Sequence, residues 1–325
     1  MKKIATLLLA LALLMSLALP FLLPSGALLE EKRDELMDQL WQQEEGGWLT
    51  WLLPTARAQS APPPLPIDFS PGRELNPAGL SDTGYLDDSI ELRLETIKDD
   101  GVVLRVAYVN ISHPSQLRTA TAGKPGSSRV ALVSSMAKKH NAVLAISANY
   151  MSNDPVKTSF EYRMGERVRN RPNRTKDLLI IDENGDFHLF IKSDEQQIQA
   201  FEEEGHTIIN AFTFGPALVK EGELLAIDRN YGYNPLGKEP RLAIGQTAPL
   251  TYVIVLAEGR RRNSDGLTLQ AMAQVMYDLG CLEAFNLDGG NSATMVFDGG
   301  YYHNKTKANE RAQSDMIYFA SLGGE

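Results

Sequence analysis

Apolar and polar residues alternate with a period of two over much of the chain beyond residue 84, which is the pattern of half-buried β-strands. Four pairs of such runs flank short turns, three of which contain glycine, and this spacing predicts β-hairpins. The turns lie at 99–101, 183–185, 221–222 and 247–249. The chain is therefore expected to be rich in antiparallel sheet.

Two stretches repeat their apolar residues at helical spacing instead. They cover 128–139 and 267–279, and Gly280 provides a stop signal for the second helix. In that helix Leu269, Met272 and Met276 share one face with two further apolar residues. Many hairpins with few helices predict an α+β fold, a mixed and largely antiparallel sheet with a few packed helices, in one domain at 84–325.

The N-terminus predicts export. Two lysines precede an almost unbroken apolar run from Ile4 to Leu23, the pattern of a secretory signal, and the run is also long enough to cross a bilayer. Residues 1–27 are thus a signal peptide or a membrane anchor, and the sequence leaves both possibilities open. Residues 28–83 read as a spacer and a Pro-rich linker. We expect an extracytoplasmic protein, secreted or anchored to the outer face of the cytoplasmic membrane, with membrane contact only through this segment.

Composition narrows the class of protein. The 325 residues are 43% hydrophobic and 22% charged, with a net charge of -9, which suits a globular domain and argues against a nucleic-acid partner. The single cysteine, Cys281, lies in an apolar context and is interpreted as a small core residue. The five histidines are scattered without ligand spacing, so neither a metal nor a cofactor is expected. Calcium sites built from oxygen atoms would leave little trace in a sequence.

Candidate chemistry gathers in the stretch FNLDGGNSATM, residues 285–295. An apolar strand, Leu282 to Leu287, ends in Asp288 and is followed by two glycines and three polar side chains. A second unit of helix, strand and polar loop ends at Asn149, near Asp154. Ligands often bind at such strand ends, so we expect both loops to open on one cleft, with the side chains of Asn149 and Asp288 about 10 Å apart. The alternative is a plain turn whose aspartate bonds its own backbone.

The region 240–318 resembles the phosphodiester glycosidase family. The matching stretches are PRLAIGQ (240–246), AEGR (257–260), NLDGGNSATM (286–295) and ER (310–311), preceded by GPALVKEGE (215–223). Their order and spacing match, and a weaker likeness extends back to AISANYMSND and covers most of the chain from about residue 84. Departures from the family pattern are Asn291 for a glycine, Leu242 for a threonine, Glu258 for an aspartate and Tyr150 for a glycine.

The resemblance implies a hydrolase that cleaves a sugar 1-phosphodiester on the sugar side and releases free sugar and a phosphomonoester, here from cell-wall or exopolysaccharide phosphodiesters. Residues 84–325 would be its catalytic domain, and a sugar phosphate or polysaccharide its partner. Asp288 is the expected nucleophile or ion-pair stabiliser, with Asn149 and Thr294 as further catalytic residues. The expected substrate-binding residues are Arg241, Arg260, Arg311, Gly289, Gly290, Asn291 and Ser292. The alternative is a non-catalytic exported module that binds anionic wall or capsule polysaccharide.

Overall fold

The computed structural model describes residues 70–99, 101–148, 159–305 and 309–323. The chain divides into two units, Met1–Pro62 and Pro63–Glu325, and every described residue belongs to the second. The predicted export signal and most of the predicted linker lie outside the described residues. Within the described ranges, no helix is both long and apolar enough to cross a membrane.

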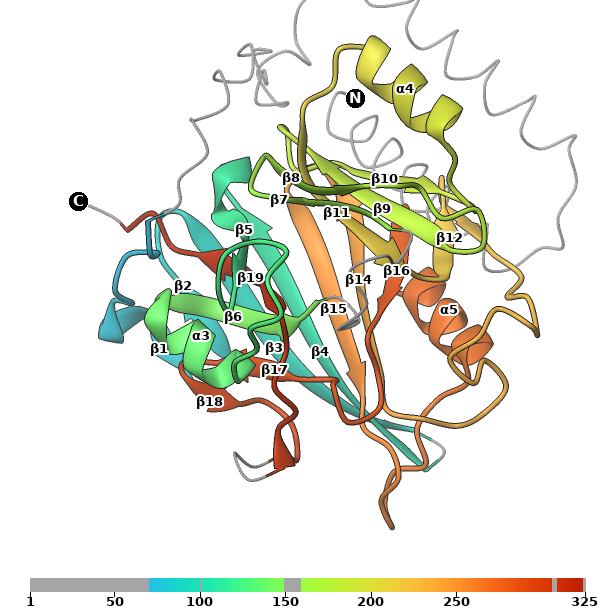
Figure 1. The fold of residues 1–325 in the computed structure, drawn as a ribbon. Helices are drawn as coiled ribbons and strands as arrows, with labels where there is room; N and C mark the ends of the chain where they lie inside the picture. Colours follow the sequence, from blue (N-terminus) through green and yellow to red (C-terminus); the bar gives the residue numbers. More distant parts are fainter. Residues whose placement is uncertain (1–69, 100, 149–158, 306–308, 324–325) are drawn as a thin grey trace, which may run out of the picture. The chain divides into compact units, whose positions relative to one another are not determined.

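The largest sheet of the described chain has nine strands, and every neighbouring pair is antiparallel (Figure 1). Their spatial order is β1 (Leu80–Ser81), β2 (Gly84–Leu86), β3 (Ile90–Asp99), β4 (Val102–Ile111), β15 (Thr251–Ala257), β14 (Arg241–Ala248), β16 (Glu283–Leu287), β12 (Ala217–Lys220) and β13 (Glu223–Leu224).

Two five-stranded antiparallel sheets complete the described β-structure. One has the order β10 (Phe187–Phe190), β9 (Asp177–Asp182), β11 (Ile208–Phe214), β7 (Phe160–Arg163) and β8 (Glu166–Asn170). The other has the order β18 (Gly300–Tyr301), β17 (Met295–Phe297), β6 (Ala142–Ser147), β19 (Asp315–Ala320) and β5 (Leu117–Thr121).

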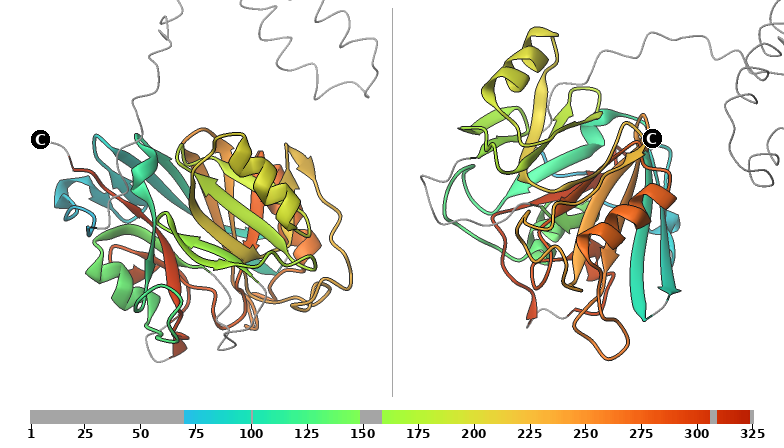
Figure 2. Two further views of the ribbon diagram at one scale, coloured as in Figure 1. Left: turned by 45° about the horizontal axis from the view of Figure 1, so that its top comes forward. Right: turned by 90° about the vertical axis from the view of Figure 1, so that its right-hand side faces the viewer.

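One central core joins the three sheets, because each sheet contributes the apolar residues of one face to it. The opposite face of each sheet packs against a helix, as Figures 1 and 2 show. The helix α5 (Leu269–Asp278) covers the nine-stranded sheet, α3 (Val133–Lys139) covers the sheet of β6, and α4 (Glu195–Glu203) covers the sheet of β9. Two short 3-10 helices, η3 (Pro77–Gly79) and η4 (Pro114–Gln116), lie in connections. Because side chains alternate along each strand, one face of every sheet packs in the central core and the other packs against a helix.

The predicted fold class is confirmed, and so are the four hairpins. They are β3 with β4, β9 with β10, β12 with β13, and β14 with β15. The helix α5 is confirmed as well: Thr268 caps its first turn through Ala271 N–H, and Gly280 has a φ of 77° just beyond its end. Cys281 is buried beneath α5, and burial raises the pKa of its thiol to about 12, as suits a core residue.

Two boundaries and one helix differ from the sequence-based prediction. The helix α3 begins at Val133 rather than at 128, because Ala131 exchanges two backbone hydrogen bonds with Gln313. The helix α4 was not predicted, although its Asp194 and Gln197 form a capping box. The folded domain includes residues ahead of 84, since Gly72 N–H donates to the carbonyl of His140 at 2.9 Å and β1 pairs with β2.

Candidate active site

Asp288 stands where β16 leaves the nine-stranded sheet, and its side chain is largely buried. Its N–H donates to the carbonyl of Ala148, at the end of β6, over 3.4 Å. The ends of β16 and β6 therefore lie side by side, as two loops that share a cleft require. Asn149 and Asp154 lie outside the described residues, so the expected distance of about 10 Å between the side chains of Asn149 and Asp288 stays a prediction.

The two glycines after Asp288 are required for different reasons, Gly289 by a close approach to Pro240 and Gly290 by its positive φ. A Cβ atom at Gly289 would lie 2.6 Å from the carbonyl oxygen of Pro240. Gly290 has a φ of 57°, and its N–H donates to the same carbonyl at 2.8 Å. The N–H of Gly290, an expected substrate-binding residue, is thus engaged within the protein.

Ser292 and Thr294 are fully buried, and Thr294 fastens this loop to β6. Thr294 N–H donates to Ser147 Oγ at 3.1 Å, and Ser147 N–H donates to the carbonyl of Thr294 at 3.1 Å. Thr294 Oγ1 donates to the carbonyl of Ser292 at 3.0 Å. These contacts order the residues that follow Asp288.

Lys305 makes the central side-chain contacts to this loop, and sequence reasoning missed it. Its ammonium donates to the carbonyls of Asn291 and Ala293 at 3.0 and 2.5 Å, and to Thr294 Oγ1 at 2.9 Å. Burial lowers its pKa to about 8, although the carboxylates of Glu310 and Asp288 act in the opposite direction. A cation therefore lies within electrostatic reach of Asp288. No local motif marks Lys305, because only folding brings it to the loop.

Arg260 also contacts the loop that follows Asp288. Its Nη1 donates to Asn291 Oδ1 at 3.2 Å, and its Nε pairs with Glu239 Oε2 at 2.6 Å. The hydrogen bond from Arg260 holds the pKa of Glu239 below its usual value. A Cβ at Gly290 would come within 3.6 Å of Arg260 Nη2, and the arginine side chain is half exposed. Arg260 is therefore placed to meet a ligand at this loop.

Arg311 is a further cation in contact with this loop. Its Nη1 donates to Ser292 Oγ at 3.3 Å, and the residue is exposed. The preceding Glu310 is buried and anchors this segment, since it accepts from Ser134 N–H at 3.1 Å and from the Tyr301 hydroxyl at 2.6 Å. The carboxylate of Glu310 thus fixes the backbone from which Arg311 extends.

Arg241 has a different environment from the one expected. The side chain is buried and donates four hydrogen bonds to backbone carbonyls, at 2.6 to 3.1 Å. The acceptors are the carbonyls of Tyr233, Asn234, Gly237 and Leu267. Four of the five guanidinium N–H groups are therefore occupied. Arg241 therefore holds the segment 233–237 in place, whereas it was expected to bind substrate.

A polar cavity of about 580 Å³ borders the loop. Its size suits one sugar or a similar small ligand. Its wall includes Gly290 and Asn291 together with four cationic side chains, those of Arg260, Arg261, Arg262 and Lys305. His303 also lines it, and burial, aided by nearby Lys305, lowers the pKa of this imidazole to about 3, so the ring is neutral near pH 7. The cavity is therefore predominantly cationic and favours an anionic ligand.

Much of the chain resembles known proteins. The family described as phosphodiester glycosidase matches residues 140–320. A protein of Bacillus subtilis (strain 168), the SPbeta prophage-derived uncharacterized protein YomE, is 36% identical over 108 residues, which are 33% of this chain and 17% of that protein. The shared part is thus about a sixth of YomE.

Two solved structures have a similar fold. The catalytic domain of zebrafish N-acetylglucosamine-1-phosphodiester alpha-N-acetylglucosaminidase, auto-inhibited by its pro-peptide, has a TM-score of 0.58 at 19% identity, over 77% of this chain and 87% of that one. A hypothetical protein from Synechocystis has a TM-score of 0.50 at 15% identity, over 71% of this chain and 62% of that one. At these identities the likeness concerns the fold.

Proposed function

Because the chain belongs to the phosphodiester glycosidase family, a family of hydrolases, we propose that it hydrolyses a sugar 1-phosphodiester at the C1–O bond. Water adds to C1, and the products are free sugar and a phosphomonoester. The observation that carries this proposal is the placement of one carboxylate, Asp288, beside a loop contacted by Arg260, Arg311 and Lys305.

The reaction requires protein groups of both charge signs near the substrate. A phosphomonoester has a second pKa of about 6 and is a far better leaving group than a sugar alkoxide, so general-acid help matters less than in ordinary glycosidases. Breaking the C1–O bond leaves positive charge on the sugar ring and negative charge on the phosphate. An enzyme accelerates this step by stabilising both charges in the transition state.

We assign to Asp288 the stabilisation of the positive charge that develops at C1 of the sugar. The carboxylate would act as nucleophile or as ion-pair partner. The phosphate would face the exposed guanidinium groups of Arg260 and Arg311, whose planar donors suit phosphate oxygens. Lys305 would add positive charge from inside the loop. Thr294 would act through its contacts with Lys305 and Ser147 rather than by touching the substrate.

The test is hydrolysis of UDP-sugars and simple sugar 1-phosphodiesters in water labelled with ¹⁸O. Cleavage at C1–O places the label in the sugar, whereas cleavage at P–O places it in the phosphate. Asp288→Asn should lower kcat by roughly a hundredfold or more with the fold intact. Asp298→Asn is the matched control, since Asp298 is exposed in the turn between β17 and β18. Turnover by Asp288→Asn at the wild-type rate would refute the assignment.

The same assay distinguishes a binding module from an enzyme. The cationic cavity would serve a protein that only binds anionic wall or capsule polysaccharide. Such a protein would bind the polymer, release neither product, and keep its affinity in Asp288→Asn. An enzyme would release both products and lose turnover in that variant.

We further propose that the protein acts outside the cytoplasmic membrane, on wall or exopolysaccharide phosphodiesters. The support is the pattern of two lysines before the apolar run 4–23. Cell fractionation with an antibody against the folded domain should find the protein beyond the cytoplasmic membrane. Recovery of the chain from the soluble cytoplasm with residues 1–27 intact would contradict this location.

A further inference from the structure

The sheet of β10, β9 and β11 brings together three side chains that lie far from one another in the sequence. Asp182 ends β9, His188 lies in β10, and His206 stands two residues before β11. The register pairs His188 with Ile180 and Ile208 with Asp182. Side chains two residues apart share a face of a sheet, so all three residues lie on the face that α4 covers.

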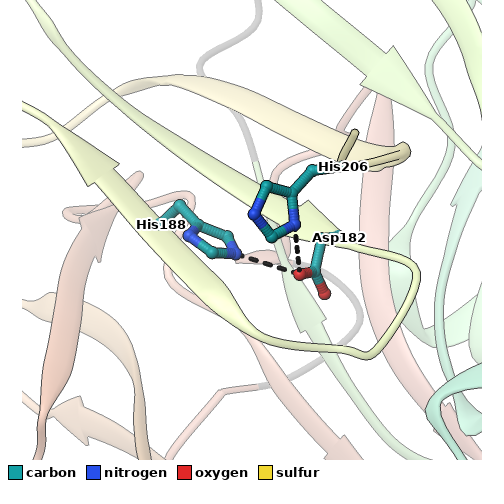
Figure 3. A group of neighbouring side chains, drawn as sticks. All are labelled: Asp182, His188 and His206. Atoms are coloured by element: carbon teal, nitrogen blue, oxygen red, sulfur yellow. Dashed lines mark hydrogen bonds and ion pairs between the residues drawn. The ribbon is translucent and has the colours of Figure 1, made fainter. Parts of the chain in front are cut away.

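The three side chains point toward one another (Figure 3). His188 Nε2 lies 3.0 Å from Asp182 Oδ2, and His206 Nδ1 lies 3.5 Å from the same oxygen. The three atoms all lie within 4.8 Å of one another. Ligand atoms around a tetrahedral Zn²⁺ are about 3.4 Å apart at bond lengths near 2.1 Å. Small rotations of the rings would therefore fit all three atoms around one ion.

The surroundings hold this geometry in place. Asp182 is buried, and its other oxygen, Oδ1, accepts from the backbone N–H groups of Asn184 and Asp186 at 2.8 and 2.9 Å. Oδ2 is thereby directed at the two imidazoles. The ring of His206 stacks on Phe201 of α4 with centroids 4.6 Å apart. Fixed partners of this kind orient ligands around a metal.

We propose that Asp182, His188 and His206 bind a divalent first-row transition ion, of which Zn²⁺ is the representative. Two imidazole nitrogens and one carboxylate oxygen are donors that such ions prefer, and a water molecule would complete the tetrahedron. The ion would fasten β9 to β10 and to the segment ahead of β11, beside a cavity of about 650 Å³ that His188 and Phe201 help to line. None of its ligands belongs to the loops around Asp288, so this site is separate from the proposed active site.

The test is Zn²⁺ binding by the full chain after dialysis against a chelator. We expect one tightly bound equivalent, measured by competition with a chromophoric chelator, and a melting temperature that rises with Zn²⁺ but not with Mg²⁺. His206→Gln and Asp182→Asn should each weaken binding by a hundredfold or more. Asp182→Asn keeps an oxygen that can accept from the two backbone N–H groups, which favours correct folding.

The matched control is His140→Gln, which removes an imidazole that packs against Tyr318 in another part of the described fold. This variant should bind Zn²⁺ as the wild type does. Circular dichroism of each variant checks that it is folded. Wild-type protein that binds Zn²⁺ no more tightly than folded His206→Gln, or an equal loss of affinity in His140→Gln, would overturn the proposal.

Discussion

Lys305 has one N–H group for each of its three acceptors only while it is protonated. Its pKa is lowered by burial to about 8, so the ammonium becomes an amine as the pH rises through that value. One hydrogen bond and the positive charge are then lost. We expect kcat/KM for a sugar 1-phosphodiester to fall above about pH 8, and Lys305→Met to lose this alkaline limb. A pH–rate profile of both proteins checks this prediction. If kcat/KM still falls above pH 8 in Lys305→Met, the titration of another group causes the fall.

The free energy of unfolding should rise above pH 8, where kcat/KM is expected to fall. A loss of activity in this pH range can therefore be distinguished from unfolding. The pKa of Lys305 is lower in the folded protein, at about 8, than its ordinary value of 10.5. Above pH 8 the unfolded chain therefore holds more protons at this lysine than the folded one, and its contribution to the free energy of unfolding increases with pH. Urea titrations at pH 8 and pH 9 should show this increase in the wild type but not in Lys305→Met.

Arg241 and Arg311 should respond differently to the same substitution. Arg241→Lys removes the planar fork that holds four backbone carbonyls, so we expect a loss of stability of about 2 kcal/mol or more. Arg311 is exposed, so Arg311→Lys should leave stability unchanged and raise KM about tenfold. Urea unfolding and steady-state kinetics distinguish the two variants. Equal effects of both substitutions on KM, with stability unchanged, would restore Arg241 as a phosphate ligand.

At the scale of elements, α5 packs closely on β14 because position 245 has no side chain. A Cβ atom at Gly245 would lie 2.9 Å from the Cε atom of Met276 in α5 and 2.6 Å from the Sγ atom of Cys281, just beyond that helix. Gly245→Ala should therefore destabilise the fold by about 1–3 kcal/mol through overpacking. Gly300→Ala is the control, because its nearest neighbour, the carbonyl of Phe297, would be 3.6 Å from the new Cβ. Urea unfolding of both variants checks this, and equal stabilities would contradict the packing argument.

At the scale of the whole described domain, a buried ion pair joins two of the three sheets. Arg163 of β7 donates from Nε to Asp315 Oδ2 of β19 at 2.7 Å, and both side chains are about 5% exposed. Asp315→Asn would leave the guanidinium charge buried without its counter-charge, so we expect a loss of about 3–5 kcal/mol. The exposed pair of Arg93 with Glu95 is the control, since Glu95→Gln should cost less than about 1 kcal/mol. Similar losses in both variants would refute this account.

Local sequence patterns were sufficient to predict much of the fold. Period-two alternation and turn residues predicted the hairpins β3–β4, β9–β10, β12–β13 and β14–β15, because strands and turns of a hairpin are set by neighbours in the chain. The face of α5 and its stop at Gly280 were predictable for the same reason. The start of α3 was not, because the pairing of Ala131 with Gln313 is a contact across the fold.

The sequence by itself also determined the family and the loop of Asp288 with its glycines, since these residues are contiguous. Only the tertiary structure decided what surrounds that loop: Lys305 was brought to it, and the donors of Arg241 were turned to backbone carbonyls. Likewise, His188 and His206 show no ligand spacing along the chain, yet sheet register places both beside Asp182. The physical reason is that charge, burial and hydrogen bonding act through space, over distances that the order of residues does not encode locally.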